Sequence, residues 1–165
     1  MTGEKELMKE LENLSSFDLG NAVGKGISFV QEAAKSLCPV NDGELRESIF
    51  TTFKGRRNEI EGICYTNKGH ASPVEFGAGP KGQASHEGIS PEVAVSYTQS
   101  PWWIHESQID KATAEKYHFF AIETKQGIFY RSSGQAAQPF MYPALANNID
   151  KVTKIVAGEA RKDMK

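Results

Sequence analysis

Two histidine–glutamate pairs have the residue types for metal or acid–base chemistry. They are His86-Glu87 and His105-Glu106. A helical zinc site of the HExxH kind needs a second histidine four residues after the first, so that both imidazoles face one metal ion. Position 90 is a serine and position 109 is an isoleucine, so neither pair completes that spacing.

The other two histidines leave one alternative open. His70 and His118 lie apart from each other and from the two pairs, in stretches expected to be loops or a strand. A cluster formed by the fold within residues 70–118 would give a small soluble metal-dependent hydrolase with a His/Glu site. Stoichiometric zinc in the purified protein, lost when His86 and His105 are changed, would favour this alternative.

Other catalytic and cofactor motifs are missing from the sequence. It contains no GxSxG nucleophile elbow, no P-loop and no Cys–His signature. Gly77, Gly79 and Gly82 satisfy GxGxxG, but no βαβ unit surrounds them, and we expect no helix to open at Gly79-Pro80. We therefore assign no catalytic, cofactor-binding or metal-binding residue, and we predict that the protein is not an enzyme and needs no cofactor.

Length and charge limit the class of protein. At 165 residues, the chain suits a single domain over 1–165 with a sizeable core. The formal net charge of −2 gives no global basic field, and no recognition helix or zinc finger is evident. A DNA-binding accessory protein is a third hypothesis, which a steep salt dependence of duplex affinity would favour.

Neither a membrane segment nor a disulfide framework is expected. No apolar run approaches the ~20 residues that span a bilayer, and the charged N-terminus lacks the apolar core of a signal peptide. We therefore expect synthesis in the cytoplasm and no membrane partner. Cys38 and Cys64 lack zinc-ligand spacing, and free buried thiols are the simplest interpretation.

The N-terminal part predicts helix over 4–37, in one or two pieces. Gly20, Gly24 and Gly26 each cost this helix about 1 kcal/mol relative to alanine. Either another backbone, such as that of a neighbouring subunit, approaches them closely, or the helix is kinked or frayed there. Two apolar stripes at helical spacing support the prediction: Leu7, Leu11 and Leu14, then Val23, Ile27, Val30, Ala34 and Leu37.

A corner between this helix and the first strand is predicted at residues 36–49, SLCPVNDGELRESI. Pro39 cannot continue a helix, and Asn41-Asp42-Gly43 is turn chemistry. Residues 44–47 can form one helical turn capped by Asp42, after which the chain becomes extended.

Two antiparallel hairpins are predicted from β-branched and aromatic runs separated by turn residues. The tip of the first carries Lys54, Arg56 and Arg57, which would face DNA, an acidic partner or only solvent. A last helix, entered through Pro143, presents an apolar face. The expected strands are 48–53 with 59–66, and 117–123 with 128–131.

The stretch 78–116 between the hairpins is the least regular, and we expect a loop excursion there. Ser72-Pro73 before it predicts the capped start of a short helix that Gly77 ends. Trp102 and Trp103 carry the largest apolar surface, and at least one of them should anchor the excursion onto the domain or onto a partner.

Four segments stand out in chain order. The first is the corner, with Pro39, Gly43, Leu45, Arg46, Ser48 and Ile49; the second is Val74-Glu75-Phe76-Gly77, followed by Ala78. The third is the Trp102-Trp103 stretch, and the fourth is GQAAQPFMYPAL at 134–145. Together they resemble the Hong Kong ninety-seven-type tail-component family, the head–tail joining or tail-completion proteins of tailed phages, although Ala78 stands where the family more often has threonine.

The resemblance implies an α+β fold and a structural role. The fold would be an antiparallel sheet of about four strands, packed against long N- and C-terminal helices. The protein would be a virion component of the neck of a phage, prophage or tail-like bacteriocin, assembled in the bacterial host cytoplasm. Arg46 and Glu75 are candidates for a charge-assisted pair within this fold.

The resemblance also implies partners. Copies would form a homo-oligomeric ring, expected as a hexamer, that joins the DNA-filled head to the tail. One face would meet the head-closure or portal-side connector protein, and the other the tail terminator or tail tube protein. DNA would pass through the lumen without its sequence being read.

Overall fold

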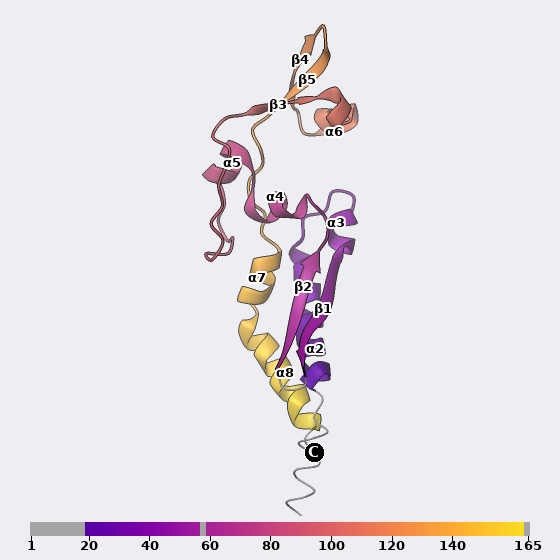
Figure 1. The fold of residues 1–165 in the computed structure, drawn as a ribbon, viewed down its shortest axis with the longest axis vertical. Coiled ribbons are helices and arrows are strands. Elements are labelled where there is room, and N and C mark those ends of the chain that lie inside the picture. Colours follow the sequence, from indigo (N-terminus) through magenta and orange to yellow (C-terminus); the bar gives the residue numbers. More distant parts are fainter. Residues whose placement is uncertain (1–18, 57–58, 164–165) are drawn as a thin grey trace, which may run out of the picture. The chain divides into compact units, whose positions relative to one another are not determined.

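The computed structural model describes residues 19–56 and 59–163 (Figure 1). The chain divides into two compact units, Met1–Lys68 with Phe140–Lys165 (unit 1) and Gly69–Pro139 (unit 2). The single domain over 1–165 stays a prediction. The first apolar stripe, from Leu7 to Leu14, lies outside the described residues.

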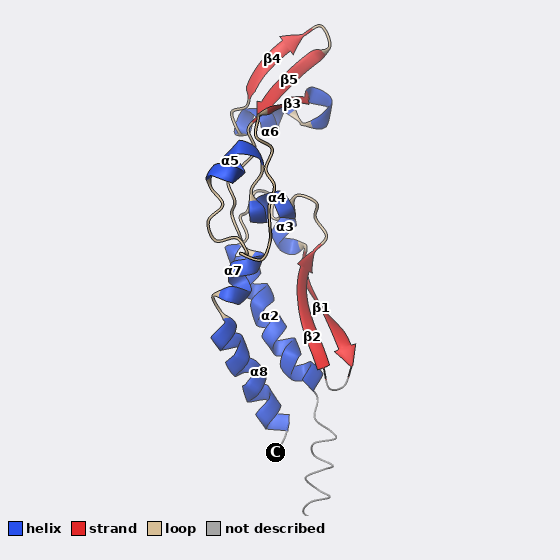
Figure 2. Ribbon diagram, turned by 60° about the vertical axis from the view of Figure 1, so that its left-hand side comes forward, coloured by secondary structure: helices blue, strands red, loops and turns tan. Residues whose placement is uncertain are grey.

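The described part of unit 1 consists of two longer helices, two short ones and a hairpin, which lies beside α2 in Figure 2. Helix α2 buries Ala22, Gly26, Val30 and Ala34, one residue per turn, as expected for an apolar stripe. Val30 and Ala34 of the predicted stripe are thus buried, whereas Leu37 is 47% exposed. The elements are α2 (Leu19–Leu37), α3 (Glu44–Glu47), β1 (Ile49–Arg56), β2 (Glu59–Thr66), α7 (Met141–Ala146) and α8 (Ile149–Asp163).

The glycines of α2 have neighbours within the same chain. A Cβ built on Gly26 would lie 2.6 Å from Cγ2 of Val156, so the missing side chain lets α8 approach closely. A Cβ on Gly24 would meet the ring of Phe53 at 3.5 Å. At Gly26 the close neighbour is therefore α8, and α2 runs as one helix from Leu19 to Leu37.

An ion pair also joins these two helices. Lys25 Nζ lies 2.5 Å from Glu159 Oε2, and Lys162 Nζ lies 2.7 Å from Glu159 Oε1. Hydrogen bonds from Lys162 and then from Lys25 lower the pKa of the Glu159 carboxyl below its ordinary value.

The lowered pKa predicts a pH-dependent effect of Glu159→Gln. A carboxyl whose pKa is lower in the folded state stabilises the protein above its unfolded pKa, and this contribution disappears as pH falls through the folded value. Glu159→Gln should therefore destabilise unit 1 at pH 7, and the difference from wild type should disappear as pH falls through the lowered pKa of Glu159. Urea unfolding followed by circular dichroism at several pH values measures this difference, and a pH-independent difference would contradict the assignment.

The hairpin of unit 1 has the predicted alternation. β1 pairs antiparallel with β2, Ile49 opposite Thr66 and Phe53 opposite Gly62. A Cβ on Gly62 would touch Ile27 and Val23, so this face of the hairpin packs on α2. Ile49 and Phe140 are the largest fully buried side chains among the described residues.

Unit 2 contains a sheet of three strands in the order β3-β5-β4. Its hairpin turns at Lys125-Gln126, because Thr124 pairs with Gly127. The elements are α4 (Ala71–Phe76), α5 (Gly79–Ala84), β3 (Trp102–His105), a 3-10 turn η1 (Glu106–Gln108), α6 (Lys111–Lys116), β4 (Phe120–Thr124) and β5 (Gly127–Ser132).

The α+β class with antiparallel sheets is confirmed, but the prediction of one four-stranded sheet is wrong. The described strands form a two-stranded and a three-stranded sheet, because each hairpin belongs to a different unit and Trp102–His105 adds a strand to the second. The 78–116 stretch is also more regular than predicted, since α5, β3, η1 and α6 lie within it. Only α2 and α8 exceed six residues among the described helices.

Local predictions around the glycine-rich stretch also need correction. A helix does open at Gly79-Pro80, with Pro80 in its first turn, although the described strands form no βαβ unit. Helix α4 begins at Ala71, one residue before Ser72, and no side chain caps it. The strand predicted from 117 begins at Phe120, because α6 continues to Lys116.

Within the part of the chain that the structure describes, no helix has both the length and the apolarity needed to cross a bilayer.

Candidate assembly surfaces

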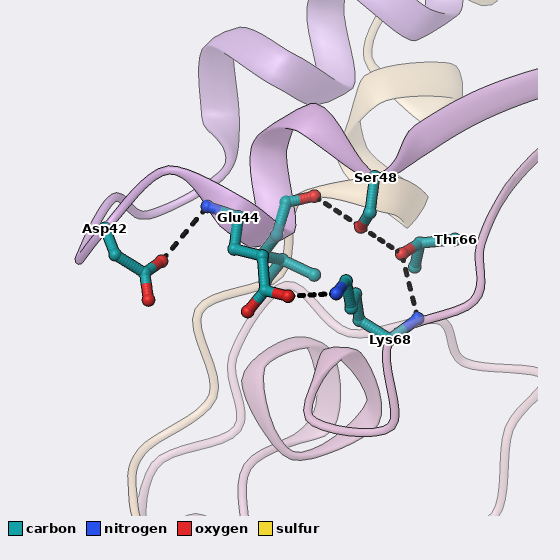
Figure 3. A network of polar contacts seen from close by, with 6 residues as sticks. Asp42, Glu44, Ser48, Thr66 and Lys68 are labelled. Carbon is teal, nitrogen blue, oxygen red and sulfur yellow. Dashed lines mark hydrogen bonds and ion pairs between the residues drawn. The ribbon is translucent and has the colours of Figure 1, made fainter.

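The corner that precedes β1 is held by a chain of polar contacts (Figure 3). The N-cap of α3 is Gly43, whose φ of 91° favours glycine, and not Asp42 as predicted, although Asp42 Oδ1 does accept a hydrogen bond from the Glu44 amide at 3.0 Å. Ser48 Oγ donates to the Leu45 carbonyl at 2.8 Å. The Ser48 hydroxyl lies 2.6 Å from that of Thr66.

These contacts tie α3 to the end of β2. The Lys68 amide donates to Thr66 Oγ1 at 3.3 Å, and the Lys68 ammonium pairs with Glu44. Because the one hydroxyl proton of Ser48 goes to the Leu45 carbonyl, the Thr66 hydroxyl must donate to Ser48 Oγ. Each hydroxyl therefore accepts one hydrogen bond and donates the next, and such chains of hydrogen bonds reinforce one another.

Ser48→Ala is expected to destabilise unit 1 by about 1–2 kcal/mol, because it leaves the Thr66 hydroxyl and the Leu45 carbonyl without this partner in a mostly buried site. Urea unfolding followed by circular dichroism measures the change. Ser36→Ala, at an exposed position of α2, is the control and should stay within about 0.5 kcal/mol of wild type. Equal effects of the two variants would contradict a structural role for the Ser48 hydroxyl.

The Arg46–Glu75 pair stays a prediction. Arg46 donates to the Cys38 carbonyl at 3.4 Å within unit 1, whereas Glu75 is buried in unit 2. A double-mutant cycle with unchanged stability would count against the pair.

In unit 2, the second and fourth segments of the resemblance meet. Ala78 and Gln135 form an antiparallel bridge, with their amides and carbonyls paired at 2.9 and 3.0 Å. The Gln138 amide donates to the Val74 carbonyl at 2.8 Å. Gly134 has a φ of 78°, and a Cβ there would lie 1.8 Å from the Ala78 carbonyl oxygen, so glycine is required at this position. The two segments thus form one structural junction.

The histidines are not brought together. His86 Nδ1 lies 2.9 Å from the Gln83 carbonyl oxygen, and its ring is 5.6 Å from that of Tyr97. His105 Nδ1 accepts from the Ser107 amide at 3.2 Å, so its Nε2–H donates to the Gln126 carbonyl at 3.0 Å. Among the described residues, no group of three or more His, Cys, Asp or Glu side chains can hold a metal ion. These contacts hold loops in place, and no observation favours the hydrolase alternative.

Two further titratable groups have structural explanations. Hydrogen bonds from the Thr113 hydroxyl and amide lower the pKa of Asp110, which caps α6. Burial raises the pKa of the Cys64 thiol, although Lys35 acts in the opposite direction. Cys38 is buried and Cys64 half-buried, and neither forms a disulfide. None of these groups is arranged for catalysis.

The outer face of the unit 1 hairpin presents an exposed aromatic pair. Phe50 and Tyr65 are opposite each other in the register, with ring centroids 6.2 Å apart. They are 45% and 42% exposed, on the face turned away from α2. At the tip, Lys54 is exposed, whereas the side chain of Arg56 and all of Arg57 lie outside the described parts, so the role of these cations stays a prediction.

The sheet of unit 2 has a second exposed apolar face. Trp103, Arg131 and Phe120 form one row across β3, β5 and β4. The rings of Trp103 and Phe120 are 6.2 Å apart, with 44% and 63% of each residue exposed. Trp102 points the other way, toward Gly79, where a Cβ would lie 2.7 Å from its ring. One tryptophan thus anchors the stretch inside unit 2, and its neighbour is available to a partner.

Sequence reasoning missed both aromatic pairs. The period-two alternation of strands could have identified Phe50 and Tyr65, because Ile49 and Gly62 take the inward positions. No comparable signal marks Trp103 with Phe120, because their proximity depends on the long-range pairing of β3 with β5.

The exposed aromatic rows suit contacts with other proteins, and a family comparison agrees. Residues 5–77 match the family described as "Bacteriophage HK97-gp10, putative tail-component". The predicted relationship to this family is confirmed over those residues, which include the corner and the Val74–Gly77 segment. The match supports a structural role in a phage and a place in the virion.

The comparisons go no further than this family. No curated protein and no solved structure matches the chain. The Trp102-Trp103 and 134–145 segments lie beyond the matched residues, so their assignment to the family stays a prediction.

Proposed function

We propose that this protein is a tail-completion, or head–tail joining, protein that forms a ring in the phage neck. The observation that carries the proposal is the match of residues 5–77 to a tail-component family. A structural role of this kind needs surfaces for other proteins, not a catalytic centre. We assign no catalytic, cofactor-binding or metal-binding residue.

The exposed aromatic pairs support assembly. Large exposed apolar side chains gathered in rows are characteristic of protein contacts, since aromatic residues are enriched at interfaces. The Phe50–Tyr65 pair and the Trp103–Phe120 pair lie on different units, so one copy offers two separate contact surfaces. A heterologous contact between such surfaces closes into a ring when a whole number of copies completes one full turn. We expect six copies.

The ring would lie between two different neighbours. One face meets the head-closure or portal-side connector protein, and the other meets the tail terminator or tail tube protein. DNA passes through the lumen, and a net charge of −2 fits passage without tight binding. Assembly takes place in the bacterial host cytoplasm.

Electron microscopy of particles from a phage or prophage lacking this gene tests the proposal. We expect filled heads and finished tails lying separately, and joined particles when the wild-type gene is supplied in trans. Normal joined particles in the deletion strain would overturn the neck assignment.

Complementation with variants tests whether exposed aromatic side chains carry the role. Trp103→Ala with Phe120→Ala should fold but fail to restore joined particles, because it removes the exposed row of unit 2. Val93→Ala, at a valine that is 42% exposed outside the sheet, is the matched control and should restore them. Full complementation by both variants would exclude this row as a necessary contact.

A further inference from the structure

Unit 1 contains an apolar groove that no described part of the chain fills. It lies between α2, β2 and α7, with a volume of about 540 Å³. Ile27 and Val30 of α2, and Gly62 and Cys64 of β2, line one part of it, and Leu145 lines the opposite part. No charged side chain lines it, so any occupant must present an apolar surface.

The rim of the groove is exposed. Leu145 is 44% exposed and Ile149, at the start of α8, is 53% exposed. The described residues thus leave about half of each residue uncovered, although α7 and α8 otherwise belong to the packed side of the unit.

The chain that precedes α2 has a matching apolar stripe. Eighteen residues, 1–18, stand before the described part, and Leu7, Leu11 and Leu14 follow helical spacing among charged residues. As a helix, this stripe would be about 10 Å long, at 1.5 Å per residue. Helix α7, which forms the opposite wall, has six residues and so a similar length of about 9 Å.

We propose that the leucine stripe of one copy occupies the groove of the next copy. If the helix that the sequence predicts over 4–37 is one piece, Leu11 would lie about 24 Å from Ile27 along its axis, and the stripe would project beyond its own groove. The groove of a neighbouring copy would then offer the stripe an apolar surface of similar length. Such an exchange is heterologous, so it propagates from copy to copy and can close into a ring. The inference rests on the proposed ring for the second copy and names the contact that builds it.

Cys64 makes the proposal directly testable, because its thiol lines the groove. A tagged chain carrying Leu11→Cys and Cys64→Ser is mixed with the untagged wild-type chain and oxidised at alkaline pH. Alkaline pH is needed because burial raises the pKa of the Cys64 thiol and the thiolate is the form that reacts. Cys38 is 2% exposed and should not compete. We expect a disulfide-linked dimer of one tagged and one untagged chain.

Two controls define the contact. The dimer should disappear when the untagged chain carries Cys64→Ser, and when the tagged chain carries Val93→Cys in place of Leu11→Cys. Absence of the mixed dimer overturns the proposal. A second outcome would also overturn it. If a chain that carries Leu11→Cys and keeps its own Cys64 forms only an intramolecular disulfide, the leucine segment fills the groove of its own chain.

Oligomeric state gives an independent readout. The wild-type chain should form oligomers in light scattering, and Leu11→Asp should raise their dissociation constant at least tenfold by placing a charge in the groove. Asn13→Asp adds the same acid beside the stripe and should leave assembly unchanged. A monomeric wild type, or equal effects of the two variants, contradicts the proposal. These solution experiments are separate from the deletion phenotype, so the groove contact and the neck role can fail independently.

Discussion

Gly134→Ala is expected to destabilise unit 2 by about 3–4 kcal/mol. Its φ of 78° costs an L-residue about 1–2 kcal/mol. The added Cβ would lie 1.8 Å from the Ala78 carbonyl oxygen, so the Ala78–Gln135 bridge must open, at about 1 kcal/mol for each of its two hydrogen bonds. This bridge joins the start of α5 to the segment that leaves β5.

Tryptophan fluorescence measures this effect selectively. Both tryptophans of the chain, Trp102 and Trp103, belong to unit 2, so their emission during urea unfolding reports that unit. Gly69→Ala is the matched control in the same unit, because a Cβ at that position meets nothing within 4 Å. Its stability should stay within about 0.5 kcal/mol of wild type. If Gly134→Ala were as stable as the wild type, the junction would not need glycine at this position.

Phe140→Ala is expected to destabilise unit 1 by about 3–5 kcal/mol. Its side chain is fully buried, so truncation removes apolar burial and leaves a cavity in a core that contains Ile49 and Ala144. Circular dichroism during urea unfolding follows α2 and α8, which contain most of the helix of this unit.

Phe50→Ala provides the matched control for this truncation. Phe50 belongs to the same unit, but it is 45% exposed on the outer face of the hairpin. Its loss should cost the isolated protein about 1 kcal/mol or less, although it removes one side of the aromatic pair with Tyr65. Similar losses from the two substitutions would mean that Phe140 is not a core residue.

Features determined by neighbouring residues were predictable from the sequence. The corner is one example, because Asp42, Gly43 and the helical turn that follows interact within a few residues. The hairpin of unit 1 is another, since strand alternation alone places Gly62 and Cys64 on one face and Tyr65 on the other. The relationship to a tail-component family also came from short motifs, and it is confirmed over residues 5–77.

Features that depend on long-range pairing were not predictable. Trp102–His105 becomes a strand because it pairs with β5, about thirty residues later. This pairing gives unit 2 its own three-stranded sheet, whereas the sequence analysis expected one four-stranded sheet for the whole chain. Helix α5 opens at Gly79-Pro80, where the Lys81 amide finds the Ser133 carbonyl.

By itself, the sequence determined the turns, the hairpin alternation and the relationship of residues 5–77 to a phage tail-component family, because these depend on residues close together in the chain. Tertiary structure alone decided which strands share a sheet and that Trp102 packs inward while Trp103 stays exposed. It also decided that an apolar groove stays open between α2, β2 and α7. These features arise from contacts between segments that are distant in the chain, and local sequence patterns do not show how stable such contacts are.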